Sequence, residues 1–345
     1  MELGERKRSI LKAIISDYIQ TGEPIGSRTI SKKCNIGLSS ATIRNEMADL
    51  EELGFLEQPH TSAGRIPSDK GYRYYVDQLM EINYPSDQET RIIKNILELA
   101  TLNEIDKIIQ RTTKLLSDIT KYTTAVISPS MSRGTLKSIQ LIRVTPTEIV
   151  AIILTDMGLI KHVLIKLPEQ ITSDKLTKIN NMLNDKLRGL TVEEIDLSVI
   201  FSIQSEIGEY NEILNAVIPA LYECLKPNTS DIYLEGAMNI FQYPEYNDID
   251  KARSFLSLVE HKDVLMDLIY SGDSSLSVSI GNENNVDEAK ECSIITTSYS
   301  IGDRDAGRIG IIGPRRMDYA KVIGTLNSLA DTLNSILKNM YEYKE

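Results

Sequence analysis

The chain has 345 residues, 41% of them hydrophobic and 25% charged, which is the balance of an ordinary globular protein of two or three domains. No apolar run approaches the roughly 18 to 20 residues of a membrane span, and the N-terminus lacks the apolar core of a secretory signal. We therefore expect a cytoplasmic protein with no membrane partner. Three widely separated cysteines, Cys34, Cys224 and Cys292, fit reduced, buried thiols better than a disulfide framework.

The net charge of −11 is distributed unevenly along the chain. Residues 1–75 carry 11 Lys/Arg and 10 Asp/Glu, whereas the remainder carries 27 basic and 39 acidic residues. The basic side chains are therefore concentrated in the first fifth of the chain. Because phosphate binding depends on a local basic patch, the acidic total does not exclude a nucleic-acid partner.

The first 80 residues predict the order helix, helix, turn, helix, two-stranded wing, helix. Apolar residues at helical spacing predict a first helix over 5–20, which the segment Thr21–Pro24 ends. The other expected elements are a helix that Ser27 caps, a turn at Asn35–Gly37, a helix capped by Ser39, wing arms at 55–59 and 65–67 around a tip at 60–64, and a helix from Ser68 to about Met80.

The third helix is the candidate for reading DNA bases. Placing Ile43, Met47 and Leu50 toward the core leaves a face of small residues, one Arg and one Asn pointing outward. Arg and Asn can pair bidentately with guanine and adenine edges, and acidic residues in the last turns restrict this role to the N-terminal half. The predicted base contacts are Ala41, Thr42, Arg44 and Asn45.

Polar and basic residues that flank this helix are suited to the DNA backbone. The predicted backbone and wing contacts are Arg28, Lys32, Lys33, Ser39, Ser40, His60, Thr61, Ser62 and Arg65. An alternative interpretation is that Arg44 and Asn45 form an ordinary solvated helix face. The helix, turn, helix and wing order, with a stop signal at each joint, favours the DNA-binding interpretation.

Beyond Tyr84–Ser86, a polar break with a proline, the pattern predicts a body of helices and strands. A helical segment is expected over 87–120, with its apolar stripe at Ile92, Ile96, Leu99, Leu102 and Ile105. Strands are expected at 123–128, 136–144, 148–155, 159–167, 276–280, 293–298 and 308–312, with mostly helical structure over 169–270. This order suggests an α+β domain that an insertion interrupts.

A last helix over 317–341 carries apolar residues at alternating steps of four and three. They are Val322, Leu326, Leu329, Leu333, Ile336 and Met340. This seam either packs against the helical segment 87–120 within the domain or forms a coiled coil between chains. We favour the packing within the domain.

No catalytic, metal or cofactor site is expected, so the chain is not predicted to be an enzyme. The three histidines do not lie near a cysteine at metal-ligand spacing. The glycines at 307, 310 and 313 do not open a helix after a strand, which argues against a dinucleotide site. Arg315 and Arg316 are interpreted as a solvated surface pair.

Three segments resemble the HrcA family of bacterial heat-inducible transcription repressors. They are SSATIRNEMADLEELGFLEQPHTSAGRIPSDKGYRYYV (39–76), YLEGAMNIFQYPEY (233–246) and SYSIGDRDAGRIGIIGPRRMDY (298–319), in family order. The resemblance implies a multidomain α+β fold. Its expected parts are a winged helix-turn-helix at 1–84, a GAF-like domain at 85–168 plus 272–345, and an inserted, mostly helical dimerising domain at 169–271.

The same resemblance implies a homodimeric repressor of chaperone operons that binds double-stranded DNA at an inverted-repeat operator. It further implies that temperature and a chaperonin partner modulate the activity. Two alternatives remain: a winged-helix repressor whose GAF-like body senses a small metabolite, and a chaperone-binding adaptor that does not bind DNA.

Overall fold

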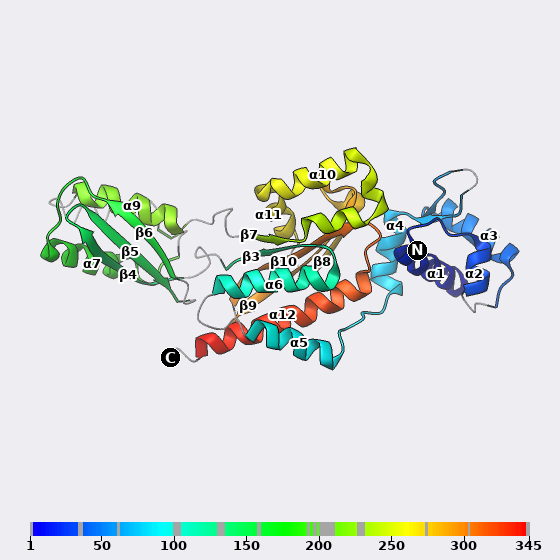
Figure 1. The fold of residues 1–345 in the computed structure, drawn as a ribbon, viewed down its shortest axis with the longest axis horizontal. Coiled ribbons are helices and arrows are strands. Elements are labelled where there is room, and N and C mark those ends of the chain that lie inside the picture. Colours follow the sequence, from blue (N-terminus) through cyan, green and yellow to red (C-terminus); the bar gives the residue numbers. More distant parts are fainter. Residues whose placement is uncertain are drawn as a thin grey trace. The chain divides into compact units, whose positions relative to one another are not determined.

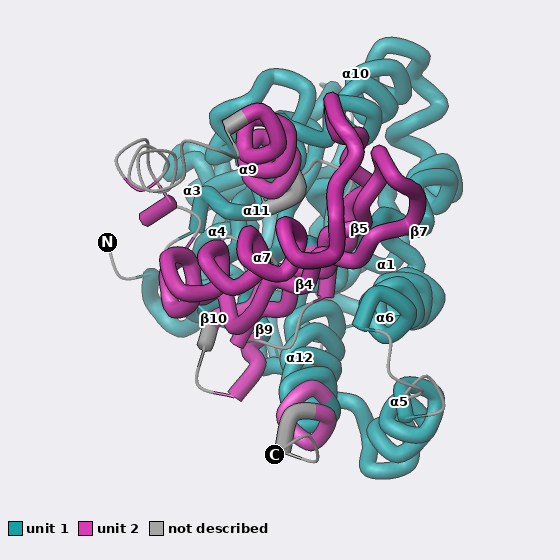
Figure 2. The backbone as a smooth tube through the Cα atoms, turned by 90° about the vertical axis from the view of Figure 1, so that its left-hand side faces the viewer, with its two compact units in different colours: residues 1–127, 232–299, 308–336 teal, residues 128–231, 300–307, 337–345 magenta. Residues whose placement is uncertain are grey.

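The computed structural model combines helices and sheets in two compact units (Figure 1). It describes residues 3–33, 37–60, 63–98, 105–129, 135–156, 160–191, 194–195, 199, 211–225, 232–272, 275–302 and 304–342. Unit 1 comprises residues 1–127, 232–299 and 308–336, and unit 2 comprises 128–231, 300–307 and 337–345 (Figure 2).

Unit 1 begins with the expected winged-helix order of elements. They are α1 (Glu5–Thr21), α2 (Ser27–Lys33), α3 (Ser40–Glu52), β1 (Leu56–Glu57), β2 (Ile66–Pro67), α4 (Asp69–Tyr74) and a π-helical turn η1 (Tyr75–Leu79). Ser68 caps α4 as predicted, because its side chain accepts a hydrogen bond from Gly71 N. Ser27, by contrast, is the first residue of α2 and not its cap. Gly37 has a φ of 68°, while the rest of the predicted turn, with Cys34, lies outside the described residues.

A five-stranded antiparallel sheet forms the centre of unit 1, in the order β7-β3-β10-β9-β8. The strands are β3 (Thr123–Ile127), β7 (Ile232–Glu235), β8 (Leu276–Ile280), β9 (Cys292–Ile301) and β10 (Arg304–Pro314). β3 lies between β7 and β10, and all five of its residues are buried. Successive side chains of a strand point to opposite faces of the sheet, so a fully buried strand needs helices on both faces.

Helices cover the two faces of this sheet (Figure 1). α10 (Ile249–Glu260) and α11 (Lys262–Tyr270) cover one face, where Phe255, Leu258 and Ile269 pack against residues of β3 and β9. α6 (Ile105–Thr120) and α12 (Tyr319–Glu342) lie on the other face, beside α5 (Asp87–Glu98). Short 3₁₀ turns occur at Ala237–Gln242, Pro244–Asn247, Gly281–Glu283 and Asp287–Ala289.

The seam of α12 is buried within unit 1, as we favoured from the sequence. The seam residues from Val322 to Ile336 are at most 3% exposed.

Cys292 on β9 is also fully buried, in the core cluster that includes residues of α10 and α11. Burial raises the pKa of the Cys292 thiol to about 11, which fits a small core residue and not a reactive thiolate.

The predicted stripe on the segment 87–120 is wrong at its start. Ile93 and Leu97 are buried on α5, whereas Ile92 and Ile96 are 51% and 37% exposed. Both pairs have the same four-residue spacing, so periodicity alone does not tell which pair faces the core. Leu99 and Leu102 lie outside the described residues.

Hydrogen bonds and ion pairs join α4 to the central domain. Asp69 accepts hydrogen bonds from Asn282 N at 3.1 Å and from Arg315 Nη1 at 3.2 Å. Arg73 Nε donates to Glu283 Oε1 at 2.8 Å. These contacts fix the winged helix within unit 1.

Arg315 and Arg316 are not the solvated pair that we inferred from the sequence. Arg316 is 8% exposed, pairs with Glu245 and donates to the carbonyl of Ile19 at the end of α1. Arg315 pairs with Asp69 and Glu291. Their partners come from distant segments, so the neighbouring sequence carries no sign of the pairing.

Unit 2 contains a separate three-stranded antiparallel sheet with helices on one face. The strands are β4 (Leu136–Thr145), β5 (Glu148–Thr155) and β6 (Ile160–Lys166), and the helices are α7 (Ser173–Leu187) and α9 (Asn211–Leu225). Ile149, Ala151 and Ile153 of β5 are buried beneath residues of both helices. Asn180 and Asn184 of α7 accept hydrogen bonds from β4 backbone amides, so α7 also covers that sheet edge.

This division differs from the predicted domain boundaries. The strands at 136–167, which the pattern places in the GAF-like domain 85–168 plus 272–345, pair with one another among the described residues and lie in unit 2. Conversely β7, α10 and α11, which fall inside the predicted insert 169–271, belong to unit 1. Strand pairing decides this division, and a hairpin pattern does not reveal which sheet it joins.

Candidate nucleic-acid interface

The candidate interface starts from the N-terminus of α3, which Ser39 caps as predicted. Ser39 Oγ accepts a hydrogen bond from Thr42 N at 3.1 Å and lies 2.9 Å from Thr42 Oγ1. Ile43, Met47 and Leu50 are buried against the rest of the domain. Ala41, Arg44 and Asn45 are consequently exposed, while Thr42 is half-buried with its hydroxyl beside the cap.

Arg44 and Asn45 are available to a ligand. Neither side chain makes a hydrogen bond or an ion pair with another part of the chain that the structure describes. Two adjacent, exposed and unengaged side chains that can both donate hydrogen bonds are suited to base edges in a major groove. The small Ala41 beside them allows close approach of the helix to the bases.

Basic residues neutralise the acidic half of α3. Lys7 Nζ on α1 lies 2.8 Å from Glu46 Oε2 and 2.9 Å from Asp49 Oδ2. The hydrogen bonds that Lys7 donates to these carboxylates raise its pKa, so Lys7 stays charged at neutral pH. The pairing reduces the repulsion that Glu46 and Asp49 would exert on DNA phosphates.

The wing is built from three short extended segments. β1 pairs with β2, and Ile25 forms an additional bridge with Arg65, in which each backbone amide donates to the other residue's carbonyl at 2.9 Å. Arg65 Nε also donates to Glu51 Oε2 on α3 at 2.8 Å. Arg65, a predicted DNA contact, therefore holds the wing against α3.

The structure places the other predicted backbone contacts as follows. Arg28 and Lys32 are exposed on α2, whereas Lys33 Nζ pairs with Asp17 Oδ1 on α1 at 2.5 Å. Ser40 is half-buried in the first turn of α3, and His60 is exposed at the start of the wing tip. Thr61 and Ser62 lie outside the described residues.

Sequence reasoning missed the role of Arg6 and Lys7. Both residues lie on α1 and pair with Glu46 on α3. The basic run from Arg6 to Arg8 was visible, but its partners are about forty residues away, and only the packing of α1 on α3 brings them together.

Gly64 is required for the wing to approach Ile25, and a substitution tests this contact. A Cβ at position 64 would lie 2.4 Å from the carbonyl oxygen of Ile25. We expect Gly64→Ala to lower the free energy of unfolding by about 1–3 kcal/mol, because the two backbones must separate. Denaturant unfolding measures the change. Gly26→Ala is the matched control, since nothing lies within 4 Å of its Cβ. Equal stability of the two variants would contradict the proposed contact.

The described residues show neither a metal-binding cluster nor a membrane-spanning helix. They contain no group of three or more His, Cys, Asp or Glu side chains placed to hold a metal ion. None of their helices combines the length and apolar character that crossing a bilayer would need.

Two family models match this chain, one over the winged helix and one over most of the remainder. The family described as winged helix-turn-helix transcription repressor, HrcA DNA-binding, matches residues 2–80. The family described as HrcA protein C terminal domain matches residues 106–323.

Curated relatives match over nearly the whole chain under one name, heat-inducible transcription repressor HrcA. The protein of Clostridium perfringens (strain SM101 / Type A) is 50% identical over 98% of this chain and 99% of its own length. That of Clostridium tetani is 49% identical over 98% and 97% of the two chains, and that of Acetivibrio thermocellus is 42% identical over 99% and 98%. A crystal structure of a hypothetical protein at 2.2 Å resolution has a TM-score of 0.63 at 24% identity, covering 98% of this chain and all of that one, which shows a shared fold.

Proposed function

Because the chain belongs to the HrcA family of heat-inducible transcription repressors, we propose that it represses chaperone operons as a homodimer bound to an inverted-repeat operator. It carries a DNA-binding winged helix and its relatives are transcription repressors, which is a non-enzymatic role. The observation that carries the proposal is the exposed and unengaged pair Arg44 and Asn45 near the capped start of α3.

In the proposed complex, α3 enters the major groove by its N-terminal half. Arg44 and Asn45 read base edges, and Ala41 and Thr42 line the approach. Arg28 and Lys32 contact phosphates, together with His60 and residues of the wing tip. Arg65 orients the wing through its hydrogen bond to Glu51, and its other guanidinium N–H groups contact DNA.

Dimerisation is proposed through the outer face of the unit 2 sheet. Ile142, Val150 and Leu164 lie opposite one another across the three strands, on the face away from α7 and α9. Leu164 is 54% exposed, and Ile160 on the same face is 64% exposed. A sheet that is apolar on both faces needs a second layer, and the matching face of a second copy supplies one.

The central domain of unit 1 is proposed to be GAF-like, which its five-stranded antiparallel sheet with helices on both faces supports. We further propose that temperature and a chaperonin modulate the repressor in the bacterial cytoplasm, where it acts at the nucleoid. The name that the relatives carry supports the heat response.

A gel-shift titration with the full chain tests the proposed function. The probes are DNA fragments from upstream of chaperone operons that contain inverted repeats, and a scrambled fragment of equal composition. We expect a salt-sensitive shift, roughly 10³-fold or more tighter on the inverted repeat than on the scrambled fragment. A shift that does not distinguish the fragments would contradict a sequence-specific repressor, and no shift on either fragment would favour an adaptor that does not bind DNA.

A second candidate, a repressor that also senses a small metabolite, is supported by one observation. The described part of unit 1 contains a pocket with apolar walls between α5, α6 and α12.

A further inference from the structure

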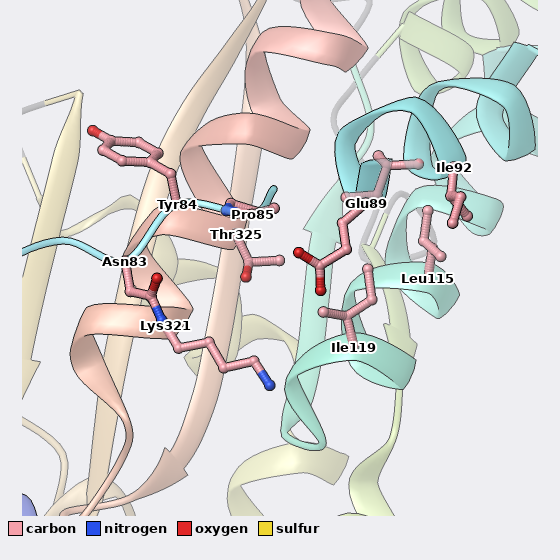
Figure 3. A pocket seen from close by; sticks show the side chains of 10 residues that line it. Asn83, Tyr84, Pro85, Glu89, Ile92, Leu115, Ile119, Lys321 and Thr325 are labelled. Carbon is pink, nitrogen blue, oxygen red and sulfur yellow. The ribbon is translucent and has the colours of Figure 1, made fainter. Parts of the chain in front are cut away.

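A pocket of about 230 Å³ lies where three helices of unit 1 meet the segment after the winged helix (Figure 3). Ile92 and Ile93 of α5 and Leu115 and Ile119 of α6 form its apolar wall. Lys321 and Thr325 of α12 lie across from them, and Asn83–Pro85 closes one side. The volume lies just below the roughly 300–1,000 Å³ of typical small-molecule sites, so the pocket suits a small ligand.

Two opposite charges border the pocket. In Figure 3 the side chains of Glu89, Thr325 and Lys321 extend toward the same space, and Ile119 borders it. Glu89 Oε2 accepts hydrogen bonds from Ser86 N and Ser86 Oγ, both at 2.8 Å, in a capping box that fixes its position. These hydrogen bonds, and more weakly the charge of Lys321, lower the pKa of Glu89, so Glu89 is ionised at neutral pH.

The charges select among ligands that the apolar wall would accept. An anionic head group near Lys321 would be repelled by Glu89, and a cationic head group near Glu89 would be repelled by Lys321. A zwitterionic head group satisfies both, with its ammonium toward Glu89 and its carboxylate toward Lys321. The adjoining wall is then free to take an apolar side chain.

We propose that this pocket binds a free α-amino acid with an apolar side chain. Such a ligand has a zwitterionic head for Glu89 and Lys321 and an apolar side chain for the wall formed by α5 and α6. This site would give the metabolite-sensing repressor its class of ligand. Binding of the amino acid does not depend on whether the protein binds DNA.

The position of the pocket links it to the winged helix. Asn83 N donates to the carbonyl of Ala320 at 3.0 Å, which holds the segment after the winged helix against α12. The two backbones are so close that a Cβ on Gly324 would lie 2.1 Å from the Asn83 carbonyl oxygen. A ligand in the pocket therefore contacts the connection between the DNA-binding domain and the rest of unit 1, and its occupancy is expected to change operator affinity.

Calorimetric titration of the full chain without DNA tests the binding site. The probes are L-leucine, 4-methylpentanoate, which lacks the ammonium group, 3-methylbutylamine, which lacks the carboxylate, and glycine, which lacks the side chain. We expect L-leucine to bind about tenfold or more tightly than each of the other three. Equal affinity for glycine, or no binding of L-leucine at millimolar concentration, would overturn the proposal.

Four variants localise the binding. Lys321→Gln should weaken binding of L-leucine by about tenfold, whereas binding of 3-methylbutylamine should not weaken, because the repulsion from Lys321 is removed. Glu89→Gln, which can still form the capping box, should weaken binding of L-leucine but not binding of 4-methylpentanoate. Ile119→Trp should abolish binding by filling the pocket, whereas Ile249→Trp, at a 73% exposed position elsewhere in unit 1, should not. Unchanged L-leucine binding in Ile119→Trp would overturn the assignment. Because no DNA is used, this outcome leaves the repressor function untouched.

Discussion

Arg44→Ala is expected to reduce the operator's advantage over other DNA while leaving nonspecific binding nearly intact. A bidentate contact from an arginine to guanine is worth about 1–3 kcal/mol of discrimination, which corresponds to roughly 5- to 150-fold in affinity. The fold should not change, because Arg44 is exposed and makes no hydrogen bond or ion pair with the described residues. Gel-shift titrations on operator and scrambled DNA, at several salt concentrations, measure the effect.

Lys32→Ala is the matched control for Arg44→Ala. Lys32 is also exposed, but it lies on α2 and is assigned to a phosphate. Its loss should weaken binding to both DNA fragments by a similar factor. The slope of log affinity against log salt concentration should fall by about one counterion. If Arg44→Ala weakened operator and scrambled DNA equally, Arg44 would be a backbone contact and the base-reading role would be rejected.

Leu164→Asp is expected to produce a monomer that binds the operator far more weakly. A charge at this exposed position does not disturb the core of unit 2, but it would be buried between two copies of the sheet. Losing the link between two winged helices should reduce operator affinity by about 10²- to 10⁴-fold, since binding of the second half-site is no longer intramolecular. Sedimentation equilibrium measures the oligomeric state, and gel shift measures the affinity.

Ile249→Asp is the control for this change, because Ile249 is 73% exposed and belongs to unit 1, not to the sheet proposed as the interface. It should leave both the oligomeric state and operator binding as in the parent protein. A Leu164→Asp protein that remained dimeric would show that the copies associate through another surface.

Local signals made most of the winged helix predictable. Ser39 and Ser68 act as caps through hydrogen bonds to residues three positions away, so a short window of sequence contains both partners. The buried positions on α3 were equally predictable, because Ile43, Met47 and Leu50 repeat at helical spacing on an otherwise polar helix. The assignment of exposed residues to bases remains a prediction.

Relations between distant segments were not predictable from the sequence. The pair between Lys7 and Glu46 and the pair between Arg65 and Glu51 depend on how α1, α3 and the wing pack together. The strand Ile232–Glu235 was included in a helical region, since four residues show too little alternation to be identified without their partner strand. In both cases the information lies in the partner and not in the local pattern.

The position of β3 between β7 and β10 affects how the protein is made. During translation β3 leaves the ribosome about 180 residues before β10, which takes roughly 10 to 35 s at 5–20 residues per second. Until β10 emerges, the edge of β3 that pairs with it has no partner, and the other edge has none until β7 emerges, while the winged helix upstream has already left the ribosome. A nascent chain of this kind presents an unpaired strand edge for several seconds, and such edges are sites of aggregation.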